Sequence, residues 1–166
     1  MDKSGRLIVA RLALVLDKKS PVLDTINRRE RKEDLMAMLT SEMKAMFEKQ
    51  LAIIATASKD GTPNVGPKGS MYVLDDQTLV YSEGTGEKTL RNLRENPKVA
   101  VVVVDRERSD GYQFKGTAEL LTSGELFEQV ERRQEERKRR VPKYAIRIRI
   151  EEVYSVKTGM TAEKIA

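Results

Sequence analysis

The sequence contains no cysteine and no histidine in its 166 residues. Without cysteine there can be no disulfide, no thiolate metal site and no cysteine nucleophile. Without histidine the chain lacks the commonest general base and the commonest metal ligand of proteins. No pair of catalytic carboxylates, no nucleophile with a neighbouring base and no metal-ligand cluster can be recognised, so the catalytic residues stay unknown and no metal site is predicted. If the chain is an enzyme, we expect a bound cofactor to carry the reaction.

Tryptophan is also absent, and long apolar runs are scarce. The run Leu7–Leu16 is too short to span a bilayer and is interrupted by Arg11, so we expect an extra packed helix or strand there rather than a secretory signal. The net charge of +5 suits a soluble protein with some attraction to anions. We therefore expect a cytoplasmic protein that does not bind a membrane.

The pattern divides the chain into an N-terminal extension, residues 1–34, and a main domain, residues 35–166. From Leu35 apolar residues recur at helical spacing, and Thr40 or Ser41 is a suitable N-cap for a second helical start within this stretch. These apolar residues are Met36, Leu39, Met43, Met46 and Phe47. A methionine-rich stripe at this spacing indicates core packing.

Beyond residue 50 the pattern changes to that of short strands. Asp60-Gly61 is a strong hairpin signal, because glycine adopts a positive φ without strain. We expect six strands, at residues 51–58, 63–74, 78–83, 98–105, 112–122 and 144–150. Pro67 and Gly69 predict a kink in the second strand, and Gly116 predicts a bulge in the fifth.

Two helices interrupt the strands, a short one that ends at Asn96 and a longer one that runs from a Ser123 cap to Arg140. The strand at 98–105 is an almost continuous β-branched run, which indicates burial on both faces or a dimer seam. Antiparallel strands with few helices favour a mainly β protein built as a small closed barrel, which also hides the sheet edges. A doubly wound α/β sheet would need a helix after most strands.

Two stretches are candidate binding sites. In GTGEKTLRN, Lys88 and Thr89 stand at a helix N-terminus after a glycine-rich turn, where free backbone N–H groups favour an anion. The Walker A spacing is absent, and a plain turn capped by Thr89 is equally compatible. In PKGSM, Pro67–Met71, a kinked strand exposes backbone groups to a planar ligand, although in isolation a barrel corner is the better explanation.

The run ERRQEERKRR, Glu131–Arg140, is a third candidate, for binding nucleic acid. Opposite charges four residues apart favour a solvated helix face instead. The expected pairs are Glu128–Arg132, Glu135–Arg139 and Glu136–Arg140. No aromatic residue is interleaved to stack on bases, so we favour the solvated face over a nucleic-acid partner.

Read together, IIATASKDGTPNVGPKG, LVYSEGTGEKTLRNLRENPKVAVVVVD and FKGTAEL resemble the pyridoxamine 5′-phosphate oxidase-like family of FMN-binding split barrels. The similarity spans roughly Leu39–Val156. Its strongest marks are DGTPNV, LVY followed by a small hydroxyl residue, and K-T-L-x-N-L-x-x-N-P-x-V-A-V. The resemblance implies a mainly β, six-stranded, antiparallel Greek-key split barrel. It also implies a homodimer with FMN in a groove at the subunit interface.

The resemblance further implies which residues bind FMN. Lys88 and Thr89 would bind the phosphate, with Ser82 nearby, and Asn92 is a weaker candidate because it can serve to cap or pack. The flavin ring and ribityl chain would lie along Pro67, Lys68, Gly69, Ser70 and Met71.

The chain also departs from the oxidase itself. Gly66 and Met71 stand where the oxidase has an arginine and a lysine, and Lys68 is a candidate to supply the missing charge from a shifted position. The oxidase's C-terminal tryptophan and R-x-H motif are absent. We therefore expect a short FMN-binding member of the family rather than a vitamin B6 oxidase.

The expected function is that of an oxidoreductase or electron carrier of unknown substrate, with NADH or NADPH as the candidate electron donor. Two alternatives stay open. One is a non-enzymatic basic barrel that binds nucleic acid or another phosphorylated ligand. The other is a scaffold that has lost its flavin and serves as an interaction protein.

Overall fold

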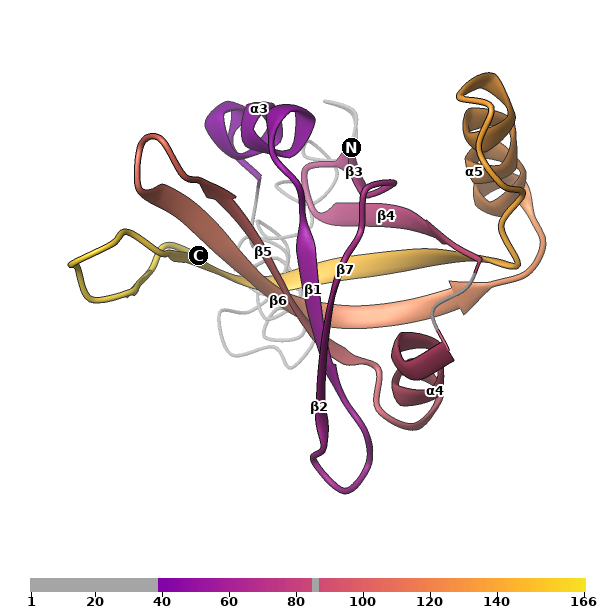
Figure 1. The fold of residues 1–166 in the computed structure, drawn as a ribbon, viewed down its shortest axis with the longest axis horizontal. Coiled ribbons are helices and arrows are strands. Elements are labelled where there is room, and N and C mark those ends of the chain that lie inside the picture. The colour runs from indigo at the N-terminus through magenta and orange to yellow at the C-terminus, as the bar shows by residue number, and fades with distance from the viewer. Residues whose placement is uncertain (1–38, 85–86) are drawn as a thin grey trace, which may run out of the picture. The chain divides into compact units, whose positions relative to one another are not determined.

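The computed structural model describes residues 39–84 and 87–166, which belong to one unit, Ala37–Ala166. Within these residues the chain forms three helices and eight strands (Figure 1). The helices are α3 (Ser41–Lys49), α4 (Glu87–Glu95) and α5 (Glu125–Glu136). The strands are β1 (Ile53–Ala57), β2 (Pro63–Pro67), β3 (Tyr72–Asp75), β4 (Thr78–Glu83), β5 (Lys98–Asp105), β6 (Asp110–Leu121), β7 (Tyr144–Ser155) and β8 (Glu163–Lys164). The predicted N-terminal extension, with its run Leu7–Leu16, lies outside the described residues.

All eight strands belong to one antiparallel sheet, which confirms the mainly β architecture. Seven of them follow the order β2-β1-β5-β6-β7-β4-β3, and β8 pairs with β7. In Figure 1, β1 and β2 run across β6, β7 and β4, as expected for a sheet that curls toward a barrel. The main core cluster joins α3 to the inward side chains of this curled sheet.

The predicted strand at 63–74 is wrong as a single element, because two strands form there. β2 ends at Pro67 and β3 starts at Tyr72, and they lie at opposite ends of the sheet order. Proline has no N–H to continue a ladder. The N–H of Met71 donates to the carbonyl of Lys68 over 3.0 Å and closes a turn. The linker 68–71 therefore joins the two edge strands of the sheet.

The part of the predicted methionine stripe that lies in α3 packs in the core, whereas Leu39 is buried just before the helix begins and Met36 lies outside the described residues. Met43, Met46 and Phe47 are buried, and the Phe47 ring centroid lies 5.2 Å from that of Phe114. Thr40 is the N-cap, since its hydroxyl accepts a hydrogen bond of 3.3 Å from the N–H of Met43. None of the helices in the described part of the chain is long and apolar enough to cross a membrane.

β5 buries one face only within the described chain. Val99, Val101 and Val103 are buried, whereas Val104 is 45% exposed. The alternation corrects the expectation that this strand is covered on both faces by its own chain. The dimer-seam interpretation of the same strand stays a prediction.

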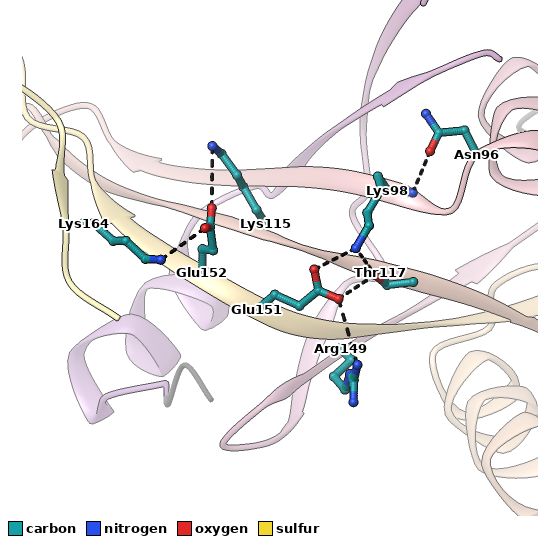
Figure 2. A network of polar contacts seen from close by, with 8 residues as sticks. All are labelled: Asn96, Lys98, Lys115, Thr117, Arg149, Glu151, Glu152 and Lys164. Carbon is teal, nitrogen blue, oxygen red and sulfur yellow. Dashed lines mark hydrogen bonds and ion pairs between the residues drawn. The ribbon is translucent and has the colours of Figure 1, made fainter. Parts of the chain in front are cut away.

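A bulge is present between β6 and β7 at the position of Gly116, but the bulged strand is β7 and not the strand that contains Gly116. A register shift between Lys115 and Gly116 leaves Glu151 as the extra residue of β7. The Glu151 carboxylate accepts hydrogen bonds from the Thr117 hydroxyl, at 2.6 Å, and from the Lys98 ammonium, at 2.9 Å. Figure 2 shows these side chains converging from β5, β6 and β7. The bulge therefore aims a carboxylate at a partner on the adjacent strand, β6, and at a second partner on β5, the strand beyond it.

α5 differs from the predicted helix at both ends. Its N-cap is Gly124, which makes no side-chain cap, instead of Ser123. The helix ends at Glu136 and not at Arg140, because Lys138 adopts the left-handed conformation with φ 51°.

The charge pairing predicted for this helix forms only in part. Glu128 and Arg132 lie 3.9 Å apart, as expected for residues one turn apart. Arg139 and Arg140 lie beyond the helix end, and no ion pair involves either of them among the described residues. The predicted pairs Glu135–Arg139 and Glu136–Arg140 are therefore wrong.

Candidate functional site

The first two turns of α4 present their side chains in two directions. Thr89 and Asn92 are 5% and 3% exposed, and their three-residue spacing places them on one face of the helix. Lys88 lies on the exposed side. The buried pair anchors the helix, and the lysine is left at the surface.

A cluster of small polar side chains ties α4 to β1 and β2. The Asn64 amide donates to the Thr89 hydroxyl over 3.1 Å, and the Asn92 amide donates to the Thr56 hydroxyl over 3.1 Å. Thr56 is 5% exposed. Thr89 and Asn92 were predicted as site residues, whereas Thr56 and Asn64 were missed. Asn64 belongs to the DGTPNV motif of the family resemblance, and its place in this motif could have indicated it as a site residue.

A cleft of about 540 Å³ lies beside the exposed side of α4. Three cationic side chains, Lys59, Lys88 and Arg91, and two acidic ones, Asp60 and Glu95, line it together with smaller polar residues. Three cations against two acids give the cleft a small positive excess. This small excess can attract an anionic group, but tight binding would also need hydrogen bonds from the polar residues of the cleft.

Asp60 contributes a fixed negative charge to this cleft. Hydrogen bonds from the Ser58 hydroxyl, and then from the backbone of Thr62, lower the pKa of Asp60 to about 2. The carboxylate is therefore ionised at neutral pH. Glu95 accepts a hydrogen bond of 3.3 Å from the N–H of Lys59, which ties α4 to the hairpin between β1 and β2.

Lys68, in the 68–71 linker, is held by a buried ion pair. Its ammonium lies 2.5 Å from the Glu83 carboxylate and 5.0 Å above the centroid of the Tyr81 ring. The Lys68 and Glu83 side chains are only 12% and 4% exposed. Burial also raises the pKa of the Tyr81 hydroxyl well above its usual range. An anionic ligand that binds the Lys68 ammonium would therefore have to compete with the Glu83 carboxylate for the same ion pair.

Ser70 and Ser82, both predicted site residues, are in direct contact. The Ser70 hydroxyl donates to the Ser82 carbonyl and accepts from the Ser82 N–H, each over 3.2 Å. The end of β4 is thereby fixed to the linker that joins the two edge strands. Pro67 is exposed at the end of β2, and Met71 is buried.

Five of the nine predicted site residues line two clefts. Lys88 and Asn92 line the cleft at α4. Lys68, Gly69 and Met71 line a larger one of about 850 Å³, which is also bordered by α3, β3 and the C-terminal end of α5. Predicted residues are joined to the sheet by the polar cluster behind α4, by the Ser70–Ser82 contact and by the Lys68–Glu83 ion pair.

Comparison with known proteins gives the family. The sequence profile of the pyridoxamine 5′-phosphate oxidase family matches residues 39–157. An uncharacterised protein of Methanocaldococcus jannaschii is 38% identical over 135 residues, which cover 80% of this chain and 90% of that protein. The structure of HupZ from Group A Streptococcus is 40% identical, with a TM-score of 0.71, over 76% of this chain and 100% of that chain.

A more distant solved structure supports the fold. An FMN-binding protein from Syntrophomonas wolfei is 15% identical, with a TM-score of 0.63, over 84% of this chain and 99% of that chain. The predicted split-barrel fold is confirmed, although the eight strands exceed the six expected because 63–74 forms two strands and β8 is additional. The family match spans all of the described helices and both clefts. The chain belongs to the pyridoxamine 5′-phosphate oxidase-like family of split-barrel proteins.

Proposed function

We propose that this protein is a homodimeric FMN-binding flavoprotein, an oxidoreductase or electron carrier whose substrate is unknown. The observation that carries the proposal is the start of α4, where exposed Lys88 stands directly before buried Thr89 and beside an open cleft. Family membership and the FMN bound by a distant relative of the same fold agree with it.

The residues at α4 fit the phosphate of FMN. The Thr89 hydroxyl oxygen accepts a hydrogen bond from the Asn64 amide. The hydroxyl proton of Thr89 is therefore available to donate to a phosphate oxygen. The α4 N-terminus contributes its partial positive charge, and Lys88 adds a full one. Asn92 acts indirectly in this proposal, because its amide is bonded to Thr56 and holds the helix in position.

The 67–71 stretch fits the remainder of the cofactor. It lies between the two sheet edges and is fixed by the Ser70–Ser82 contact, so its backbone is held in place for a planar ring. FMN, when bound, supplies the capacity to accept and donate electrons. The protein's part is to bind and orient the cofactor, with NADH or NADPH as the candidate electron donor.

An apolar face of the sheet, exposed among the described residues, supports the homodimer. Ile53 of β1 pairs with Val102 of β5, and Ala55 pairs with Val65 of β2, so these side chains share the outward face of three strands. Ile53 is 37% exposed, Val65 66% and Val104 45%. Contiguous exposed apolar surface of this kind is typical of an interface between subunits. We propose that a second copy of the chain covers it.

The role of Lys88 is tested by titrating FMN into the flavin-free protein and its Lys88→Ala variant. Loss of a charge-assisted bond to phosphate should weaken binding by ~1.5–3 kcal/mol, about one to two decades in Kd. Lys115→Ala, a surface lysine on β6 that lies 3.7 Å from Glu152, is the matched control and should bind FMN like the parent. Equal FMN affinity in the parent and Lys88→Ala would remove Lys88 from the site.

A further inference from the structure

The larger cleft has a strongly cationic lining. Six of its side chains carry positive charge and two carry negative charge. The cations are Lys44, Lys49, Lys68, Arg133, Arg137 and Arg139, and the acids are Glu48 and Asp75. The volume of about 850 Å³ lies within the usual range of small-molecule sites.

Two of these cations form ion pairs with residues that the structure describes, and the other four do not. Lys44 pairs with Asp76, and Lys68 pairs with Glu83. Among the residues that the structure describes, no ion pair involves Lys49 or any of the three arginines. Three of these four cations, the arginines, lie at the C-terminal end of α5, and Lys49 lies at the end of α3.

The geometry of the arginines suits an anion with several oxygens. The Arg133 guanidinium carbon lies 4.1 Å from the centroid of the Tyr72 ring, and its buried Nε has no hydrogen-bond partner in the described chain. Arg139 is placed by one bond of 2.9 Å from its guanidinium to the carbonyl of Gly69. Guanidinium groups present several N–H donors in a plane and bind phosphate in two-point contacts.

The early end of α5 creates this arrangement. A helix continued to Arg140 would place Glu135 and Arg139 one turn apart as an ion pair. The left-handed residue Lys138 ends the helix instead, and Arg137 and Arg139 then line the cleft. Gly69, which holds Arg139, belongs to the stretch proposed to lie along the flavin. A ligand in the cleft would thus be a neighbour of the flavin ring.

We propose that this cationic cleft binds the phosphate groups of a phosphorylated nucleotide and thereby selects NADPH over NADH as the electron donor. The choice of donor rests on the proposed flavin function, whereas the phosphate site rests on the cleft alone. NADPH differs from NADH by one phosphate group on the adenosine ribose. Arginines without an ion-pair partner in the described chain can form charge-assisted hydrogen bonds to this phosphate group. NADH cannot form these bonds, so the cleft would bind NADPH more tightly than NADH.

The experiment measures calorimetric binding of 2′,5′-ADP and of 5′-AMP to the full chain, with the flavin content recorded. We expect 2′,5′-ADP to bind at least tenfold more tightly than 5′-AMP, and Arg137→Ala and Arg139→Ala each to weaken it by roughly ten- to hundredfold. The control is Arg132→Ala, on the same helix but paired with Glu128 and outside the cleft lining, which should leave binding unchanged.

Equal binding of the two nucleotides, or equal loss in the Arg132 and Arg137 variants, would overturn the phosphate site. Binding of an oligonucleotide that needs the same arginines and weakens steeply with salt, without 2′,5′-ADP binding, would overturn it in favour of nucleic acid. Tight 2′,5′-ADP binding by a protein that cannot hold flavin would support the phosphate site and overturn the donor role together with the flavin proposal. A flavin-loaded protein that does not bind 2′,5′-ADP would overturn the proposed phosphate site, and the flavin proposal would be unaffected.

Discussion

Glu151 shows how a single residue makes the outer face of the barrel sensitive to acid. The Thr117 hydroxyl first, and then the Lys98 ammonium, hold the pKa of Glu151 below its usual value of 4.5 (Figure 2). A carboxylate whose pKa is lowered by folding stabilises the protein above its unfolded pKa. That contribution is lost as the pH falls below about 4.5 and through the lowered value.

Replacing Glu151 with glutamine should remove the contribution of this carboxylate to the pH dependence of the free energy of unfolding. At pH 7 we expect Glu151→Gln to lower the free energy of unfolding by about 0.2–1 kcal/mol, because the pair is partly solvated. The difference from the parent should shrink as the pH falls below 4.5, as followed by denaturant unfolding at a series of pH values. Glu107→Gln, an exposed carboxylate in no ion pair within the described chain, is the control. A difference that persists unchanged at low pH would contradict this explanation.

At the scale of elements, the β6–β7 ladder depends on a glycine. A Cβ built on Gly116 would lie 2.1 Å from the carbonyl oxygen of Arg149, so a side chain there would force the two strands apart. We expect Gly116→Ala to lower the free energy of unfolding by about 1–3 kcal/mol or more, measured by denaturant titration. Gly66→Ala is the matched control, since its Cβ would meet nothing within 4 Å. Equal stability of the two variants would show that the strands can part without loss.

The elements predicted correctly are those whose pattern is local. α3 has its N-cap and methionine stripe within ten residues, and β7 shows clean alternation of Ile146 and Ile148 with Arg147 and Arg149. The errors lie where tertiary contacts decide. Whether Pro67 kinks a strand or ends it depends on which neighbour the next strand finds, and β3 pairs with β4 at the far edge.

The candidate site divides in the same way. Lys88, Thr89 and Asn92 follow one another on one short helix, so the sequence indicates them together. Thr56 and Asn64 reach the same cluster from β1 and β2, and only the fold brings them there. The cationic cleft could not be predicted, because a helix that continued to Arg140 would pair Arg139 with Glu135 and because only the fold brings the end of α5 beside α3 and β3.

At the scale of the whole molecule, the proposed dimer depends on the outward face of β1, β2 and β5. Val65 is the most exposed of the apolar side chains on that face, at 66%. Val65→Asp should give a monomer where the parent is a dimer in light scattering, because an interface loses affinity when a charge is buried in it. Met160→Asp, equally exposed at 65% but in the C-terminal turn, should stay dimeric. A parent protein that is monomeric at all concentrations would remove the dimer proposal.

The proposed function of the whole molecule depends on bound FMN. The most direct measurement is the visible absorption spectrum of the purified protein, repeated after adding FMN and removing the excess by desalting. We predict a yellow protein that keeps its flavin spectrum through desalting, with Lys88→Ala retaining less. A colourless protein that cannot hold added FMN would contradict the central claim.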